Sequence, residues 1–428
     1  MGCKHSLRRG RPSSVGSGRC AATAVPTTVK KTLSDIDAAA IRGRTVVVRA
    51  DLNVPLEAGR ITDDRRIRAS LPTLRALIDA GARIVLLSHL GRPKGQRNPD
   101  LSLAPVSRRL GQLLGCPVSL VPHVHGAKAV GPVESLPAGV IALLENTRFL
   151  PGETKNDPEL AAAWAALGDL FVNDAFATAH RAHASTVGLA NAMVARRRKA
   201  VAGLLMAREL RFLEEVLRMP ERPFVLIIGG AKISGKIGVI SELLPRVDRL
   251  LIGGAMASTF FRALGLDTGA SLVQEDSIRV ARGLLEDGGE RLVLPVDCIV
   301  AQEVVEGAEA RAVSRTDVSG EDKILDIGPE SRARFTDMIE RSRSIVWNGP
   351  MGVFEIDAFA KGTVSIAHAV ANACDAGALG VLGGGDSAAA AEHAGVVDRL
   401  THVSTGGGAS LELLAGASLP GVDSLTDC

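Results

Sequence analysis

The sequence has few aromatic residues and no tyrosine. Phe, Trp and Tyr together make up 3% of its 428 residues. Proteins that hold single-stranded nucleic acid usually stack the bases on aromatic side chains, so this composition argues against such a surface. The net charge of +3 is too small to attract polyanions in general. We therefore expect no nucleic-acid partner, and we expect any basic site to be local.

Cysteine is scarce, and long apolar runs are missing. The six cysteines are scattered without a CxxC pair or a CxxC…HxxxH pattern, which argues against a zinc site. Such a distribution is typical of reduced thiols in a cytoplasmic protein. No run approaches the roughly 18 apolar residues that a membrane-spanning helix needs. The sequence thus predicts a cytoplasmic protein that does not interact with a membrane.

Residues 1–28 lack acidic side chains and carry Lys4, Arg8, Arg9, Arg11 and Arg19. Three interpretations are open. The Arg- and Ser-rich composition is typical of a transit peptide, and Met1-Gly2 with Ser6 matches the myristoylation pattern. We favour the third interpretation, a disordered tail translated from a start codon placed too far upstream. The folded core is expected to begin at Val29.

Beyond the tail, short apolar runs alternate with longer amphipathic segments. The runs are continuous rather than alternating, which is typical of parallel strands buried on both faces. Between them lie helical patterns such as Arg66–Ala80 and Asp157–Leu167. Strand–helix alternation over this length predicts parallel α/β sheets. The candidate strands are 45–49, 84–87, 141–144, 170–172, 224–228, 250–252, 292–294, 345–347 and 379–382.

The pattern breaks near the middle of the chain. A charged stretch at 195–200 precedes a strongly amphipathic helix at Gly203–Arg218, and Pro220 and Pro223 follow. We predict two domains of similar size joined by this helix. The expected organisation is a tail at 1–28, an N-terminal domain at 29–200, an interdomain helix and hinge at 201–222, a C-terminal domain at 223–404, and a C-terminal segment at 405–428 that returns towards the N-terminal domain.

In the first half, cationic and polar side chains follow the predicted strands. Ligands of open parallel sheets bind at the carboxyl ends of the strands, so these side chains are expected to converge on one rim. The candidates are Arg49, Arg66, His89, Arg92, Arg148, Arg181 and His183. Any one arginine alone is best explained as a solvated surface residue. Several at successive strand ends predict a site for a small, multiply anionic metabolite, because guanidinium groups bind phosphate and carboxylate oxygens bidentately.

In the second half, glycine follows the strands. Four glycine clusters occur, at 229–230, 253–254, 383–385 and 406–408. Glycine allows close approach of the backbone to phosphate, and helix N-termini offer free N–H groups. These loops predict a nucleotide site. Asp386 is the natural magnesium ligand, with the Ser387 hydroxyl beside it.

One glycine loop nearly matches a P-loop. Gly230 and Gly235-Lys236 have the spacing of GxxxxGK[ST], but Ile237 stands where the hydroxyl residue should be. The magnesium-binding hydroxyl of that motif is therefore missing, and we interpret the match as fortuitous.

Eight segments together resemble the phosphoglycerate kinase family, in that family's order. They are VRADLNVPL, SHLGRPKG, LLENTRF, DAFATAHRAHAST, GGAKISGKI, WNGPMGVFE, GGGDS and STGGGASLELL. The resemblance runs from about Val29 to the C-terminus. It implies two Rossmann-like parallel-sheet domains with an active-site cleft between them, and a monomer. The implied reaction is reversible phosphoryl transfer between 1,3-bisphosphoglycerate and ADP, giving 3-phosphoglycerate and ATP.

The resemblance also implies roles for individual residues. The 3-phosphoglycerate contacts would be Asp51, Asn53, Arg66, His89, Arg92, Arg148 and Arg181. The nucleotide contacts would be Lys232, Lys236, Ile324, Glu355, Gly384, Gly385, Asp386 and Ser387, with Asp386 holding Mg²⁺ and Glu355 facing the ribose. Arg66, Lys232, Gly407 and Gly408 would surround the phosphoryl group in transfer. The nucleophile is an ionised carboxylate, so no general base is needed, and catalysis is positioning and charge neutralisation.

Three positions depart from the family pattern. Gly235 stands where an acidic or polar residue is expected, Ala177 replaces a glycine, and Ile324 replaces a small residue near the adenine. Gly235 and Ile324 put nucleotide affinity and base preference in doubt. Two alternatives remain open: a different ATP-using enzyme on a similar scaffold, and a non-catalytic or altered-specificity paralogue. The second predicts loss of a charged catalytic residue, yet Arg66, Lys232, Lys236 and Asp386 are all present.

Overall fold

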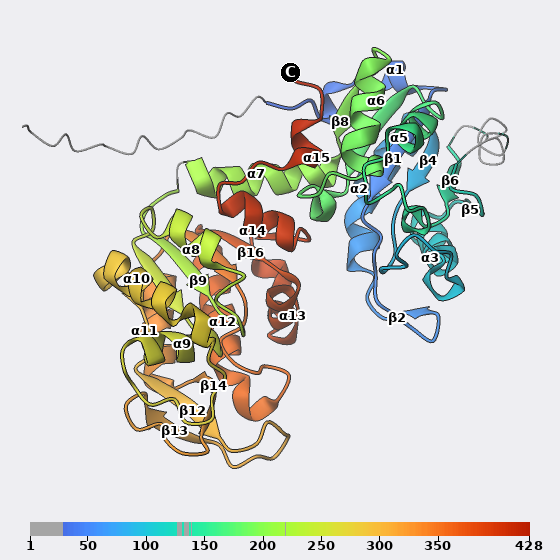
Figure 1. Ribbon diagram of the computed structural model, residues 1–428. Helices are drawn as coiled ribbons and strands as arrows, with labels where there is room; N and C mark the ends of the chain where they lie inside the picture. The colour runs from blue at the N-terminus through green and yellow to red at the C-terminus, as the bar shows by residue number, and fades with distance from the viewer. Residues whose placement is uncertain (1–28, 126–130, 132–136, 138, 219) are drawn as a thin grey trace, which may run out of the picture.

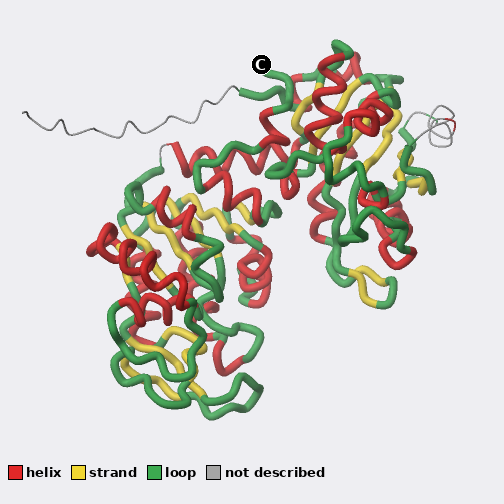
Figure 2. The backbone as a smooth tube through the Cα atoms, viewed as in Figure 1, coloured by secondary structure: helices red, strands yellow, loops and turns green. Residues whose placement is uncertain are grey.

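The computed structural model describes residues 29–125, 131, 137, 139–218 and 220–428. The predictions made for the tail at 1–28 lie outside the described residues. The described chain forms two lobes connected by helix α7 (Leu204–Arg218), as Figure 1 shows. In each lobe the strands lie among helices (Figure 2). The predicted class, α/β with two parallel sheets, is confirmed.

The sheet of the N-terminal domain is parallel, with the strand order β5-β6-β4-β1-β7-β8 among the described residues. Its strands are β1 (Thr45–Ala50), β4 (Arg83–Leu87), β5 (Val118–Val121), β6 (Ile141–Leu144), β7 (Leu170–Asp174) and β8 (Ala200–Ala202). Its helices are α1 (Ala38–Ile41), α2 (Arg65–Asp79), α3 (Ala104–Leu114), α5 (Pro158–Ala165) and α6 (Leu189–Ala195).

The sheet of the C-terminal domain is also parallel, with the order β11-β10-β9-β15-β16-β17 among the described residues. Its strands are β9 (Phe224–Ile228), β10 (Arg249–Ile252), β11 (Leu292–Val293), β15 (Ser344–Asn348), β16 (Leu379–Gly383) and β17 (His402–Val403). Its helices are α8 (Ile237–Leu243), α9 (Met256–Ala263), α10 (Ile278–Gly288), α11 (Pro329–Glu340), α12 (Lys361–Asp375) and α13 (Gly385–His393). Two further helices, α14 (Gly408–Leu414) and α15 (Pro420–Asp423), follow β17 in the C-terminal segment.

Both faces of each parallel sheet are buried, which explains the continuous apolar runs. In β1, Val46 and Val48 pack with α2 and α3, whereas Val47 points to the opposite face and packs with α5 and α6. In β15, Trp347 packs with α11 and α12, and Val346 packs on the other side with α8. All nine predicted runs lie in strands of these two sheets.

Two small antiparallel sheets were not predicted. A hairpin of β2 (Leu56–Glu57) and β3 (Arg60–Ile61) precedes α2, and a three-stranded sheet, β12 (Asp297–Ala301), β13 (Arg311–Ser314) and β14 (Lys323–Ile327), is inserted in the C-terminal domain. The hairpin strands, of two residues each, are too short to show a period, and β13 is largely exposed and leaves no apolar run. The mostly buried segments of β12 and β14 were not among the predicted strands.

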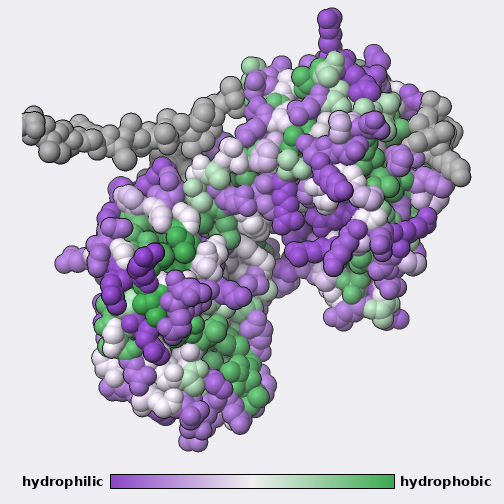
Figure 3. All heavy atoms as spheres, in the orientation of Figure 1, coloured by the Kyte–Doolittle hydropathy of each residue, from purple (hydrophilic) through white to green (hydrophobic). Residues whose placement is uncertain are grey.

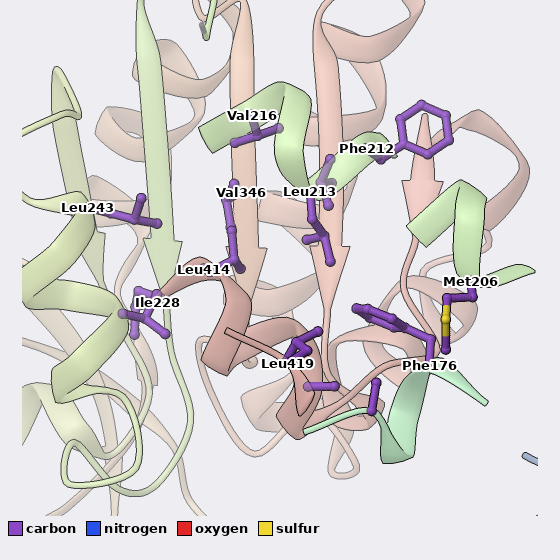
Figure 4. Packing of buried hydrophobic residues seen from close by; sticks show 14 of the residues in the cluster. Phe176, Met206, Phe212, Leu213, Val216, Ile228, Leu243, Val346, Leu414 and Leu419 are labelled. Atoms are coloured by element: carbon purple, nitrogen blue, oxygen red, sulfur yellow. The ribbon is translucent and has the colours of Figure 1, made fainter. Parts of the chain in front are cut away.

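Helix α7 is packed against both sheets. Phe212, Leu213 and Val216 on this helix belong to one apolar cluster that includes Val346 of β15 and Leu414 of α14 (Figure 4). The same cluster continues into the N-terminal domain, and α7 also contacts β7. The helix therefore joins the two hydrophobic cores into one.

The C-terminal segment lies against the N-terminal domain. The Lys30 ammonium forms an ion pair with Asp427 at 2.7 Å, and the Thr426 N–H donates to the Ala200 carbonyl at 2.8 Å. Strand β8 extends the first sheet to Ala202, two residues past the predicted domain limit. The predicted limits themselves stay predictions. Among the described residues, no helix is both long and apolar enough to cross a membrane.

We predict that Leu213→Ala destabilises the whole chain. Leu213 is fully buried where α7 meets the two domains, so truncation leaves a cavity that costs about 2–5 kcal/mol. Urea unfolding followed by circular dichroism measures the loss. Val194→Ala is the matched control, because Val194 is 49% exposed and its truncation should cost less than about 0.5 kcal/mol. Equal losses in the two variants would contradict the prediction.

Candidate active site

The carboxyl ends of the first-domain strands carry a hydrogen-bonded polar rim. Asp51 follows β1, and its Oδ2 accepts from Arg66 Nη1 at 2.6 Å, which orients the guanidinium of the first turn of α2. Asn53 Oδ1 accepts from the Gly91 N–H at 2.8 Å and so ties the β1 loop to the β4 loop. The structure therefore brings Asp51, Asn53 and Arg66 together.

The remaining predicted arginines border a neighbouring hollow. Arg92, Arg148 and Arg181 line a pocket of about 610 Å³, together with Lys94 and Lys155, which the sequence analysis did not single out. Five cationic side chains and no carboxylate line this pocket. Burial lowers the pKa of Arg148 to about 10, and the positive charge of the nearby Arg49 contributes to this shift. This concentration of positive charge suits a multiply charged anion.

Arg49 does not reach the rim, which corrects the expectation that it converges there. Its side chain is fully buried, and its Nε donates to Ser185 Oγ at 2.8 Å. Ser185 Oγ in turn donates to Glu153 Oε1 at 2.6 Å, and Glu153 is also fully buried. Arg49 and Glu153 thus form a charged layer, connected through Ser185, beneath the rim.

His89 lies at the junction of this buried layer and the rim. Its side chain is buried, and its Nδ1 accepts from Arg49 Nη2 at 3.0 Å. Burial, together with the charges of Arg49, Arg148 and Arg66, holds the pKa of His89 well below its usual range. The imidazole is therefore neutral at physiological pH and serves as a hydrogen-bonding group rather than as a cation.

In the C-terminal domain, glycines allow the ends of β9 and β15 to approach each other. Gly349 has φ +95°, and a Cβ there would lie 2.4 Å from the Gly229 carbonyl oxygen. Lys236 Nζ bridges this junction by donating to the Gly229 carbonyl at 2.5 Å and to the Asn348 carbonyl at 3.0 Å. An ammonium has three donors, so one N–H of Lys236 is left for a ligand.

The loop at 383–387 begins helix α13. Gly384 has φ +97°, which favours glycine, and Asp386 lies exposed in the first helical turn. The Ser387 hydroxyl is buried and makes two hydrogen bonds. It accepts from the Gly349 N–H at 2.6 Å and donates to the Gly383 carbonyl at 2.8 Å. Ser387 thus fixes two glycine loops to each other, and its predicted contact with the nucleotide remains untested.

The other predicted nucleotide residues are spread over the C-terminal domain. Lys232 is exposed in the loop after β9, and Glu355 is exposed in the loop after β15. Ile324 is 6% exposed and packs inside the apolar cluster that contains Val300. A Cβ on Gly235 would meet nothing within 4 Å, so the glycine there is not required by crowding.

A cleft of about 550 Å³ is lined by both domains. Arg66 contributes from α2, and Gly385 and Gly407 contribute from the starts of α13 and α14. The Arg65 guanidinium reaches across to Glu392 of α13 at 3.2 Å. Figure 3 shows a notch between the lobes, bordered on the side of the N-terminal domain by hydrophilic residues.

The glycine loop at 406–408 is held by the interdomain helix. Glu209 of α7 is fully buried, and its Oε1 accepts from the Thr405 N–H at 2.8 Å. Its Oε2 lies 2.8 Å from His402 Nε2, and the His402 ring stacks on Phe212 with centroids 4.7 Å apart. Gly408 follows, close to His180 of the N-terminal domain.

Comparison with known proteins identifies this arrangement. The family model described as phosphoglycerate kinase matches residues 35–417. The chain belongs to the phosphoglycerate kinase family. It is 53% identical over 393 residues to the phosphoglycerate kinase of Rubrobacter xylanophilus, covering 92% of this chain and 97% of that protein. It is 50% identical over 402 residues to that of Chlorobium limicola, covering 93% and 100%.

Solved structures agree with this assignment. Phosphoglycerate kinase from Coxiella burnetii matches with a TM-score of 0.81 at 40% identity, covering 92% of this chain and 98% of that one. The enzyme from Pyrococcus horikoshii matches with a TM-score of 0.80 at 33% identity over the same shares. As a phosphoglycerate kinase, the chain is a phosphotransferase with a carboxyl acceptor, and it acts on small molecules with ATP or ADP.

The site of this phosphoglycerate kinase fits one Mg²⁺ ion held jointly with a nucleotide. The described residues contain no group of three or more His, Cys, Asp or Glu side chains that would hold a metal alone. Asp386 is exposed in the first turn of α13 and offers a hard carboxylate oxygen near Lys236. One carboxylate plus phosphate oxygens is the donor set that Mg²⁺ prefers.

Sequence reasoning missed the supporting groups of this phosphoglycerate kinase. Glu153, Glu209 and His402 lie outside the quoted strand-end segments, and Ser185 lies within one of them but was given no role. Their pairing across long sequence separations leaves no local pattern. A buried acidic residue in an otherwise apolar helical face, as with Glu209 in α7, is the one available signal.

We predict that Arg49→Met destabilises the fold by about 3 kcal/mol or more, because it leaves the buried Glu153 carboxylate without a compensating charge. Urea unfolding of the purified variant gives the free energy. The double variant Arg49→Met/Glu153→Gln should lose less than the single variant. If the two substitutions are simply additive, the buried charges do not compensate each other.

Proposed function

We propose that the two half-sites of this phosphoglycerate kinase bind its two substrates separately. 3-Phosphoglycerate occupies the basic rim, with Arg92, Arg148 and Arg181 on its phosphate and Asp51, Asn53 and His89 on its polar carbon skeleton. The nucleotide occupies the glycine loops of the C-terminal domain. The observation that carries this proposal is the cleft that Arg66 lines from one domain and Gly385 and Gly407 line from the other.

Transfer in the direction of ATP synthesis needs no proton acceptor. A terminal phosphate oxygen of ADP attacks the acyl phosphorus of 1,3-bisphosphoglycerate, the bond from phosphorus to the carboxyl oxygen breaks, and 3-phosphoglycerate leaves as a carboxylate. The protein neutralises charge on the phosphoryl oxygens during this step. Arg66, already oriented by Asp51, acts from one side, and Lys232 and the backbone N–H groups at Gly407 and Gly408 act from the other.

Mg²⁺ would be held by Asp386 together with the nucleotide phosphates and would supply further charge neutralisation there. Lys236 joins the ends of β9 and β15 and directs its remaining N–H at a phosphate oxygen. Glu355 contacts the ribose, and Ile324 lies behind the base. Bringing the half-sites together requires closure about α7, which also excludes the water that would hydrolyse the acyl phosphate.

The chain works as a monomer in the cytoplasm, without nucleic-acid or membrane partners. One chain supplies residues from both domains to the cleft, so no second copy is needed to complete it. The scarcity of aromatic side chains supports the absence of a nucleic-acid surface.

The test is a coupled assay with 3-phosphoglycerate and Mg-ATP. Arg66→Ala should lower kcat by about 100-fold or more, the effect of removing one preorganised charge-stabilising donor. Arg68→Ala is the matched control on the same helix, because Arg68 pairs with Asp64 outside the cleft, and it should change kcat less than about twofold. An inactive wild type, or a fully active Arg66→Ala variant, would contradict the proposal.

We predict an alkaline loss of nucleotide affinity that depends on Lys236. Burial lowers the pKa of Lys236 to about 8, against a smaller opposing effect of Asp386. The cation that binds phosphate is therefore present below pH 8 and lost above it, so kcat/KM for ADP should fall as the pH rises through 8. Measuring kcat/KM for ADP from pH 6 to 9.5 checks this. Lys236→Arg should lack this alkaline limb, and an unchanged profile in that variant would exclude Lys236 as its source.

A further inference from the structure

Asp326 is a buried carboxylate with no part in the proposed chemistry. It lies in β14 of the inserted antiparallel sheet and is 2% exposed. Its Oδ2 accepts from the Gly362 N–H at 2.6 Å, and its Oδ1 accepts from the Ile327 N–H at 2.9 Å. Gly362 belongs to the first turn of α12, so the carboxylate also meets the positive end of that helix.

The same carboxylate packs directly against the loop that carries Glu355. A Cβ on Gly352 would lie 2.4 Å from Asp326 Oδ1, and a Cβ on Gly362 would lie 2.0 Å from the same atom. Each glycine thus allows its backbone to contact the carboxylate. Beside this contact, the Val353 N–H donates to the Leu325 carbonyl at 2.9 Å. The loop between β15 and α12 is therefore attached to β14 by a hydrogen bond at Leu325 and by packing of Gly352 against Asp326.

We propose that Asp326 is a positioning residue for the nucleotide half-site: it fixes the loop at 349–356, and with it Glu355, relative to β14 and α12. This inference rests on the proposed placement of the ribose beside Glu355. Asp326 does not touch substrate, and it acts through Gly352 and Gly362. A nucleotide that meets a preformed loop avoids the entropy of ordering it, so loosening the loop lowers nucleotide affinity without affecting the basic rim.

Burying the Asp326 carboxylate is energetically unfavourable, which supports a functional reason for its presence. Burial raises the pKa of Asp326 to about 7, against the two backbone N–H donors and Arg332, which lower it. An apolar residue in this place would avoid the desolvation of a carboxylate. The Asp326 carboxylate accepts one N–H from β14 and one from α12. An apolar side chain would accept neither of these N–H groups.

The experiment compares steady-state KM values for ADP and for 1,3-bisphosphoglycerate. Asp326→Asn keeps the size of the side chain, but its NH₂ group must face one of the two N–H donors whichever way the amide is turned. The KM for ADP should rise about five- to tenfold, and the KM for 1,3-bisphosphoglycerate should stay within about twofold. Direct titration with ADP should show the same loss of affinity.

Asp297→Asn is the matched control. Asp297 lies in the adjacent strand β12, and its carboxylate accepts from the Glu330 and Ser331 N–H groups at the start of α11 in the same manner, away from the 349–356 loop. It should lower stability and leave the KM for ADP unchanged. If both variants leave the KM for ADP unchanged, or both raise the two KM values equally, Asp326 is only a structural cap and the proposal is overturned.

A second variant changes the contact between Gly352 and Asp326 from the side of the loop. Gly352→Ala pushes a Cβ against Asp326 Oδ1 and should reproduce the selective rise in the KM for ADP. Glu355→Ala separates this inference from the function on which it rests. If Glu355→Ala leaves the KM for ADP unchanged, the ribose placement is overturned, and the inference with it. If Glu355→Ala raises it while Asp326→Asn and Gly352→Ala do not, the inference alone is overturned.

Discussion

The packing of α7 against both sheets is the interaction on which the rest of this structure depends. Its apolar face joins the core of one domain to the core of the other, and its buried Glu209 reaches the loop at 404–408. A flexible linker would leave the anion rim and the glycine loops at random distances. The packed helix instead places Arg66 of one domain and Gly407 of the glycine loop on the two sides of one cleft.

The basic rim faces a second constraint, since Arg92, Arg148 and Arg181 lie close together and above the buried Arg49. Burial is the main cause of the lowered pKa values of His89 and Arg148, and the positive charge of Arg49 lowers both further. The buried Glu153 relieves part of the repulsion between these cations from below, where a ligand cannot displace it. A bound polyanion reduces the remaining repulsion among these cationic side chains, and this reduction contributes to its binding affinity.

Much of the fold was predictable because buried parallel strands leave continuous apolar runs, and all nine runs became strands. The polar loops that follow these strands predicted the cationic rim and the glycine loops for the same topological reason, whereas the role of Asp51 was implied only by the family resemblance. The inserted sheet of β12, β13 and β14 was not predicted, since β13 is largely exposed and the short buried segments of β12 and β14 are not separated by the helices that mark a parallel sheet. Arg49 shows a further limit: its place at the end of β1 suggested the rim, but its direction into the core depends on Ser185 and Glu153, far away in sequence.

The start of α7 is connected to the helix of Arg66 through one short series of hydrogen bonds. Arg66 lies in the first turn of α2, and Thr73, two turns later, accepts from the N–H of Leu204, where α7 begins. Asp174 at the end of β7 accepts from the next two N–H groups of α7, at 2.9 and 3.2 Å. A rotation of α7 relative to the N-terminal domain has to break these three hydrogen bonds or carry α2 and β7 with it. If the bonds persist during the proposed closure, we expect α2, and with it Arg66, to move together with the start of α7.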